Sequence, residues 1–401
     1  MILRPGYTAT SYYPTIGGAQ LYLHEVARRM VDDRPLRAVA FWERHRVDWL
    51  RGTTVNAPGR PWQREVDGIE LRGIAMSPSE RARVALPAAL FYPMKSWAIR
   101  QIGSLLTDKI DAEFRGDLVH NSRIGREPFS FSSRAVARRR GVPFVFTPNH
   151  HPRWVGWNYR EYLRLYTMAD VLLVYTEAER DFLRTLGVED RRVFVTGIGP
   201  VLADEVDAAA WRIRHGIDGP MVLYLGQKFR YKNFHMLLDA APAVWAKHPR
   251  AHFVFIGPPT PFSRQHFARR AADERIVELG HVSLEDKTAA LAACDMLCLP
   301  SPQESFGMVL VEAWSQGKPV VAARSPAVAT LVSDGEDGLV VEPTPAGLAA
   351  AFIELLASSE RRTSMGAAGA EKVRRRYTWE RVMETVRAAY RAAHELPSAG
   401  D

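Results

Sequence analysis

The sequence predicts an α/β protein made of two domains, each built on a parallel sheet. Short apolar runs alternate with stretches of helical periodicity along the whole chain, which is the pattern of parallel α/β sheets. The chain has 401 residues, more than a single hydrophobic core usually serves. A polar stretch at residues 199–219 divides the pattern into two similar units.

The first unit is predicted to contain five strands after a weak opening strand. These strands are residues 37–42, 118–120, 144–147, 171–174 and 193–196, and helical patterns fall at residues 19–31, 133–140, 159–169 and 177–186. Only residues 1–3 are apolar before Arg4, Pro5 and Gly6. Either the opening strand is short or the chain begins upstream of Met1.

The second unit opens with a clear apolar strand. Its predicted strands are residues 221–225, 252–256, 296–300, 319–322 and 338–341. A final amphipathic helix at residues 379–394 carries Val382, Val386 and Tyr390 at helical spacing. Ligands of parallel sheets sit beyond the carboxyl ends of the strands, so we expect the site in a cleft between the two units.

Composition excludes several classes of protein. No run approaches the ~20 consecutive apolar residues of a membrane span, and the N-terminus lacks the apolar core of a signal peptide. Cys294 and Cys298 are the only cysteines, so no disulfide framework exists, and both fit as small apolar residues. We therefore expect a cytoplasmic protein. Zinc-ligand spacings and Asp-x-Asp motifs are absent, so we also expect no metal ion.

The positive charge is confined to the first half of the chain. Residues 1–200 carry 30 Lys and Arg against 21 Asp and Glu, a net +9, whereas residues 201–401 carry 23 against 24. Two interpretations stay open: an anionic partner, or a solvated arginine-rich face. Residues 81–100 mix basic residues, Lys95 among them, with large apolar ones, as on a membrane interface, although two prolines interrupt the helix. Nucleic acid is disfavoured, because the basic residues lack interleaved aromatic ones.

The segment at residues 300–314 carries the most specific chemistry. A helix is predicted to start around residues 305–307, where free N–H groups suit an anion or sugar hydroxyls. With Glu304 at this helix start, Glu312 would lie about 80° round and ~12 Å along, on the same broad side. Apolar neighbours surround Glu312, where an unpartnered charge is costly, which favours a functional pair over one capping and one solvated glutamate.

This E-x₇-E segment resembles that of the family 4 retaining glycosyltransferases, which have the GT-B fold. Further segments match the family in order and spacing, at residues 13–20, 169–170, 175–180, 197–199, 225–233, 317–321 and 334–341. The resemblance implies two facing Rossmann-like domains with a central cleft. Residues 1–200 would bind the acceptor, 201–219 form a linker, 220–376 bind the donor, and 377–401 return as a helix to the first domain.

The same resemblance implies a nucleoside-diphosphate sugar as donor, retention of anomeric configuration, and no metal or other cofactor. Lys232 would contact the donor pyrophosphate, Glu304 the sugar hydroxyls and Glu312 the ribose. Backbone groups at Gly17 and Gly18 would approach the β-phosphate. The other donor-binding residues would be Gly226, Gln227, Lys228, Val282, Ser305, Phe306, Gly307, Met308 and Val309.

Two positions depart from the family pattern. Gln227 stands where the family usually has arginine, so Lys228 or Arg230 is expected to supply the second cation. Asn149 stands where the family often has a histidine beside the donor sugar, and His150 and His151 follow it. We predict a sugar contact from one of these two histidines, with His151 favoured.

Other functions stay open. The fold also hosts nucleotide-sugar epimerases, phosphorylases and inverting transferases, and a catalytically silent binding subunit would fit the departures at Gln227 and Asn149. The basic first half favours a lipid-linked or otherwise anionic acceptor at the inner membrane face over a small soluble acceptor.

Overall fold

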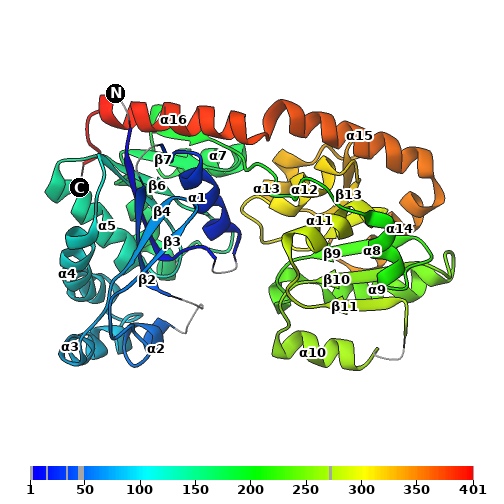
Figure 1. Ribbon diagram of the computed structural model, residues 1–401, viewed down its shortest axis with the longest axis horizontal. Coiled ribbons are helices and arrows are strands. Elements are labelled where there is room, and N and C mark those ends of the chain that lie inside the picture. Colours follow the sequence, from blue (N-terminus) through cyan, green and yellow to red (C-terminus); the bar gives the residue numbers. More distant parts are fainter. Residues whose placement is uncertain (1–2, 15–16, 33–34, 44–48, 271–272, 401) are drawn as a thin grey trace. The chain divides into compact units, whose positions relative to one another are not determined.

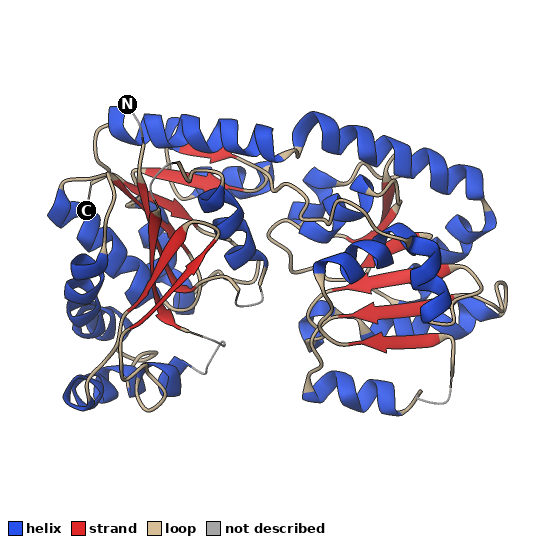
Figure 2. Ribbon diagram, in the orientation of Figure 1, coloured by secondary structure: helices blue, strands red, loops and turns tan. Residues whose placement is uncertain are grey.

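The computed structural model describes residues 3–14, 17–32, 35–43, 49–270 and 273–400. The chain divides into two units (Figure 1). The first unit comprises Met1–Thr196 and Met383–Asp401, and the second comprises Gly197–Val382. In each unit helices cover a central sheet (Figure 2), as the sequence predicts.

The first unit contains an eight-stranded sheet in the order β3-β4-β2-β1-β5-β6-β7-β8. Its strands are β1 (Pro5–Ser11), β2 (Leu36–Trp42), β3 (Trp62–Val66), β4 (Ile69–Gly73), β5 (Leu118–Ser122), β6 (Phe144–Thr147), β7 (Val171–Val174) and β8 (Val193–Val195). Neighbouring strands are parallel except β3 and β4. The five strands predicted after the opening one are present as β2 and β5 to β8.

Strand β1 corrects the expected opening of the first unit. All seven of its residues are buried, and it lies between β2 and β5. Its Thr8 hydroxyl is satisfied inside the sheet, because Asn121 donates to it from its side-chain amide at 2.9 Å. Gly6 is required there, because a Cβ would lie 2.6 Å from the Arg115 carbonyl oxygen. A central strand of threonines opened by Pro and Gly gives no apolar run, so the pattern did not show it.

The hairpin of β3 and β4 was also not predicted, although the sequence holds its signal. Asp67 and Gly68 form the turn with φ of 50° and 74°, and Asp-Gly is a favoured pair for such two-residue hairpin turns. Strand β3 is the sheet edge and is largely exposed, and β4 alternates buried apolar with half-buried charged residues, so neither gives a continuous apolar run.

The helices of the first unit are α1 (Gly18–Arg28), α2 (Trp49–Thr53), α3 (Pro78–Ala89), α4 (Lys95–Glu113), α5 (Glu127–Arg140), α6 (Arg160–Thr167), α7 (Glu177–Thr185) and the end of α16 (Trp379–Glu395). Residues 81–100, predicted to lie on a membrane interface, are divided between α3 and α4.

The assignment of Lys95 to that surface is wrong, because its ammonium is fully buried and lies 3.2 Å from the Glu127 carboxylate. The predicted final helix is confirmed, and its Tyr390 hydroxyl contacts His120 Nδ1 at 2.7 Å.

The second unit contains a six-stranded parallel sheet in the order β11-β10-β9-β12-β13-β14. The strands are β9 (Met221–Leu225), β10 (His252–Ile256), β11 (Ile276–Leu279), β12 (Met296–Leu299), β13 (Val320–Ala323) and β14 (Gly338–Val341). The helices are α8 (Ala208–Arg214), α9 (His235–Trp245), α10 (Pro261–Ala268), α11 (Leu284–Ala293), α12 (Met308–Ser315), α13 (Pro326–Leu331), α14 (Pro345–Ala357) and α15 (Ser359–Arg376). Edge strand β11 was not predicted. The stretch interpreted as a linker belongs to this unit and forms α8, whose Trp211 is buried.

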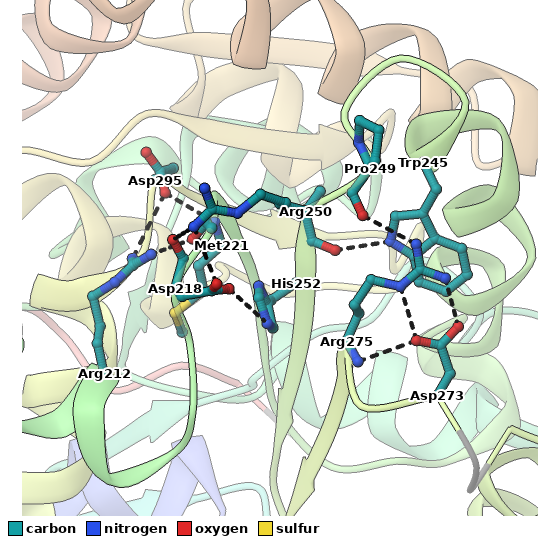
Figure 3. A network of polar contacts seen from close by, with 12 residues as sticks. Arg212, Asp218, Met221, Trp245, Pro249, Arg250, His252, Asp273, Arg275 and Asp295 are labelled. Carbon is teal, nitrogen blue, oxygen red and sulfur yellow. Dashed lines mark hydrogen bonds and ion pairs between the residues drawn. The ribbon is translucent and has the colours of Figure 1, made fainter.

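A network of hydrogen bonds and ion pairs lies at the amino ends of these strands (Figure 3). Asp295 accepts a hydrogen bond from the Met221 N–H at 2.8 Å, with Arg212 Nη1 at 3.8 Å. Arg275 pairs with Asp273 at 2.8 Å. Hollows of about 790 and 380 Å³ are lined by residues of this region. Ligands of parallel sheets bind at the opposite, carboxyl ends, so we assign this network to strand positioning.

Candidate active site

The loops after β9 and β12 bring two of the predicted site residues together. These strands are parallel neighbours, with Leu297 opposite Leu223, so the loops that leave their carboxyl ends run side by side. Lys232 Nζ lies 2.7 Å from Glu304 Oε1, although the residues are 72 positions apart in sequence. Asn233 adds a second link, because its side-chain amide donates to the Pro300 carbonyl at 3.3 Å.

The Lys232–Glu304 pair is mostly, but not wholly, covered by protein. The two side chains keep 16% and 11% of their surface exposed, so a ligand can reach them from solvent. The Lys232 ammonium and the Glu304 carboxylate neutralise each other at a site that is partly shielded from water. A donor pyrophosphate would therefore offer Lys232 a second anionic partner at little additional desolvation cost.

The helical geometry predicted for the two glutamates is wrong. Helix α12 begins at Met308, so Glu304 lies in the preceding loop and only Glu312 is on the helix. The N-cap is Gly307, whose φ of 93° favours glycine and which has no side chain to bond the first N–H groups of α12. Met308 and Val309 stand in that first turn, with Ser305 half-buried before it.

Glu312 has the partner that its apolar surroundings require. It is 2% exposed, and Lys287 Nζ from α11 lies 2.7 Å from its Oε1. Lys287 also donates to the Val201 carbonyl at 2.6 Å. Sequence analysis missed Lys287, which no local pattern marks. The contact of Glu312 with a donor ribose stays a prediction.

The structure places Lys228 inside the second unit, which contradicts its role as an accessible second cation. Its ammonium is fully buried, 2.7 Å from Glu278 Oε1 and 2.9 Å from the Leu279 carbonyl oxygen. Burial lowers its pKa, and Glu278 opposes that change. Lys228 therefore ties the β9 loop to β11, and Arg230 is the exposed cation of that loop.

The remaining predicted donor residues fall on three loops of the second unit. Gln227 is half-buried, and its carbonyl accepts a hydrogen bond from the Tyr224 hydroxyl at 2.9 Å. Gly226 packs closely against Gly257. A Cβ on Gly257 would lie 1.9 Å from the Gly226 carbonyl oxygen. Val282 is half-buried between β11 and α11. Phe306 is buried, with its ring 5.6 Å from that of Tyr377.

The structure separates the three candidates that follow β6 in the first unit. Asn149 has a φ of 47° and its side-chain amide donates to Ser122 Oγ at 2.9 Å, so it holds the loop. His150 is buried and stacks on Phe182 at 4.2 Å, and burial lowers its pKa to about 3. A buried neutral ring stacked in the core argues against a sugar contact for His150. His151 is half-buried, with its ring against Trp154.

Gly17 and Gly18 open helix α1 in the first unit. Gly17 is its N-cap and Gly18 is exposed in the first turn. The Gly17 backbone is extended, and a Cβ there would meet only the end of the Gln20 side chain at 2.2 Å. Backbone strain therefore gives no reason for glycine at position 17, and the phosphate contact stays a prediction. Residues 15 and 16 of the same loop lie outside the described residues.

Glu179 is a further residue of the first unit that sequence analysis did not place in the site. Its buried carboxylate accepts hydrogen bonds from the backbone N–H groups of His150 and Tyr175, each at 2.9 Å. It thereby fixes the loops that follow β6 and β7. Burial raises the pKa of Glu179 to about 7, against a lowering by the two backbone N–H groups.

We predict a pH-dependent stability that Glu179→Gln removes. The raised pKa means that the folded protein favours the protonated acid, so the contribution of Glu179 is complete below its ordinary pKa of 4.5 and is lost as the pH rises through about 7. The advantage of the wild type over the variant in free energy of unfolding should fall by about 3 kcal/mol across this window, as measured by urea denaturation. Glu177→Gln, an exposed neighbour on α7, is the control. An unchanged difference across the window would contradict the assignment.

In the described part of the chain, no three His, Cys, Asp or Glu side chains gather as metal ligands. Within the same ranges, no helix has both the length and the apolar character to cross a bilayer.

Two family models match the chain. The model for glycosyl transferases group 1 matches residues 207–372, and the model for the glycosyl transferase 4-like domain matches residues 17–199. Together they account for most of the chain. The chain belongs to the GT-B glycosyltransferases of the family 4 type.

Curated relatives agree with this family. A D-inositol 3-phosphate glycosyltransferase of Geodermatophilus obscurus is 32% identical over 250 residues, 58% of this chain and 54% of the relative. Phosphatidyl-myo-inositol mannosyltransferase of Mycobacterium leprae is 38% identical over 180 residues, 43% of this chain and 46% of the relative. These two matches span about half the length of each relative. A D-inositol 3-phosphate glycosyltransferase of Kineococcus radiotolerans is 27% identical over 94% of this chain and 91% of the relative.

Solved structures confirm the predicted fold. Anabaena HepE in complex with UDP and glucose has a TM-score of 0.73 and 17% identity, over 97% of this chain and 100% of that one. Sucrose-phosphate synthase from Thermosynechococcus elongatus has a TM-score of 0.71 and 17% identity, over 98% and 99%. At this level of identity the likeness shows the fold alone.

Proposed function

We propose that the protein is a retaining glycosyltransferase that moves a sugar from a nucleoside-diphosphate sugar to an acceptor hydroxyl. The observation that carries the proposal is the contact of Lys232 with Glu304 at the carboxyl ends of β9 and β12. One ammonium and one carboxylate at this point match the two kinds of group on such a donor, the anionic pyrophosphate and the sugar hydroxyls.

In the proposed reaction the bond from the anomeric carbon to the β-phosphate oxygen breaks, and the acceptor oxygen bonds to the same face of the sugar. The departing phosphate oxygen takes the proton of the acceptor hydroxyl, so no protein nucleophile is needed. Lys232 would stabilise the charge that grows on the leaving phosphate. Glu304 and the first N–H groups of α12 would hold the sugar hydroxyls. No metal ion takes part in this scheme.

The relatives indicate the class of the substrates. HepE binds UDP and glucose, which supports a nucleotide sugar as donor. Two curated relatives are named for inositol 3-phosphate and phosphatidyl-myo-inositol, which supports an acceptor that carries a phosphate. We propose a cytoplasmic protein that meets a lipid-linked acceptor at the inner face of the membrane.

A donor screen followed by product analysis tests the proposal. A bound donor raises the melting temperature, so nucleotide sugars can be ranked by thermal shift. The best donor, incubated with acceptor, should give a product whose anomeric proton has the NMR coupling of the donor configuration. An inverted product would contradict retention. Donor hydrolysis and transfer both at background would favour a catalytically silent subunit.

A further inference from the structure

Arg123, directly after β5 in the first unit, is a buried cation without an acidic partner. Its guanidinium lies 4.0 Å from the Trp154 ring centroid and 3.7 Å from that of Tyr162, and only 5% of the residue is exposed. Nη1 donates to the Tyr166 hydroxyl. Within the described ranges, no carboxylate lies at ion-pair distance from Arg123. Cation–π contacts with these rings offset part of the cost of burying the charge, and an anion at the guanidinium would offset more of it.

The remaining donors of Arg123 are open to a ligand. Among the described residues, its other guanidinium N–H groups have no protein acceptor, and they are not among the side-chain atoms sealed from solvent. Three acids lie in the region, and each has other partners: Glu127 pairs with Lys95, Glu179 accepts two backbone N–H groups, and Glu161 lies 3.5 Å from Arg160 and accepts from the Ser96 hydroxyl. Burial raises the pKa of Glu179 and nearby Arg123 opposes that rise, but among the described residues Arg123 forms no ion pair with it.

Two further arginines lie near Arg123, Arg126 at the start of α5 and Arg160 at the start of α6. Arg126 donates to the Tyr92 hydroxyl, and Arg160 lies 4.1 Å from the Trp157 ring centroid. Arg160 Nη1 is buried and, among the described residues, has no hydrogen-bond partner. Burial lowers the pKa of Lys95, and Arg126 and Arg160 add to that lowering, so both arginines lie near it.

The side chains around these arginines are apolar and exposed. Tyr92, Met94, Val155 and Trp157 keep 43%, 47%, 49% and 57% of their surface in solvent. Large apolar side chains beside arginines are the composition of a surface that meets an anionic lipid. Arg123 and Trp154 follow β5 and β6, so the region lies at the carboxyl ends of the strands, where ligands of parallel sheets bind.

We propose that Arg123, Arg126 and Arg160 form a subsite for the phosphate of a lipid-linked acceptor. This inference rests on the proposed transferase function and names the acceptor class. Arg123 binds the phosphate through its open N–H groups, Arg126 and Arg160 complete the cationic wall, and the exposed apolar side chains contact the lipid around the headgroup.

Binding of two probes by the full chain tests this subsite. The probes are phosphatidylcholine vesicles with and without phosphatidylinositol, and soluble glycerophosphoinositol, which has the same phosphate and no tails. The wild type should bind the phosphatidylinositol vesicles and, more weakly, the soluble headgroup. Arg126→Ala/Arg160→Ala should weaken both by about tenfold or more, because each arginine gives a charge-assisted hydrogen bond. Trp157→Ala should weaken vesicle binding alone.

Controls separate this subsite from net charge and from the donor site. Arg139→Ala/Arg140→Ala removes the same charge from the end of α5, where both arginines pair with aspartates, and should bind as the wild type. Equal vesicle binding by the two double variants would overturn the subsite. Soluble binding without vesicle binding would overturn the lipid assignment. Thermal shift by nucleotide sugars should be unchanged in both double variants, and its absence from the wild type would instead count against the proposed function.

Discussion

Lys232→Ala and Glu304→Ala are each expected to lower turnover by roughly two to three orders of magnitude, the usual effect of removing one group that stabilises charge in a transition state. Lys232 would lose its contact with the leaving phosphate, and Glu304 its hold on the sugar. Steady-state kinetics with the donor found by screening gives the measurement. Lys247→Ala, which removes an exposed cation just after the end of α9, is the control and should keep near-normal turnover.

Stability measurements on the same variants separate catalysis from folding. Each single variant leaves one mostly buried charge unpaired, so each should lose stability, whereas Lys232→Ala/Glu304→Ala leaves neither charge unpaired and should regain part of it. Turnover of this double variant should stay low. A double variant that recovers turnover together with stability would mean that the pair serves only the fold.

Glu312→Ala is expected to have the largest effect on stability, about 3–5 kcal/mol, because it leaves Lys287 without the acid that compensates it. Lys287 keeps 17% of its side chain exposed, so solvent can relieve part of this cost. Urea denaturation measures the loss. The predicted ribose contact adds an independent effect, a rise in KM for the donor with a smaller change in kcat.

Glu312→Gln/Lys287→Met tests the ribose contact without an unpaired charge. Stability should lie above that of Glu312→Ala, since neither ion remains, and below that of the wild type, since the Val201 carbonyl loses its hydrogen bond from Lys287. KM for the donor should still be raised, because the neutral amide has one accepting oxygen where the carboxylate has two and a negative charge. Normal donor KM in this double variant would restrict Glu312 to a structural role.

Strands that form continuous apolar runs were predictable from sequence, including the edge strands β8 and β14, whereas β3, β4 and β11 were not predicted. Strands such as β7 and β9 are buried on both faces and read as continuous apolar runs. Edge strand β11 is half-exposed and carries Glu278, so it gives no such run. Strand β1 is central, but Thr8 and Thr10 interrupt its apolar run, and the Thr8 hydroxyl accepts a hydrogen bond from Asn121 of the neighbouring strand.

Most residues of the site were predictable from local sequence patterns, but their contacts were not. The motif around Glu304 and the loop of Lys232 were visible as local patterns, but their contact depends on the pairing of β9 with β12. The burial of Lys228 depends on Glu278, which lies on the strand that was missed. Lys287 came into the site only through tertiary packing, because no local spacing relates it to Glu312.

Calorimetric titration of nucleoside diphosphates into the wild type, Lys232→Ala and Lys247→Ala tests the donor site most directly. The wild type and Lys247→Ala should bind at least one nucleoside diphosphate with equal affinity, and Lys232→Ala should bind it about tenfold or more weakly, the effect of one lost charge-assisted hydrogen bond. Equal affinities in all three proteins, or no binding by the wild type, would contradict a nucleotide-sugar site at Lys232 and Glu304.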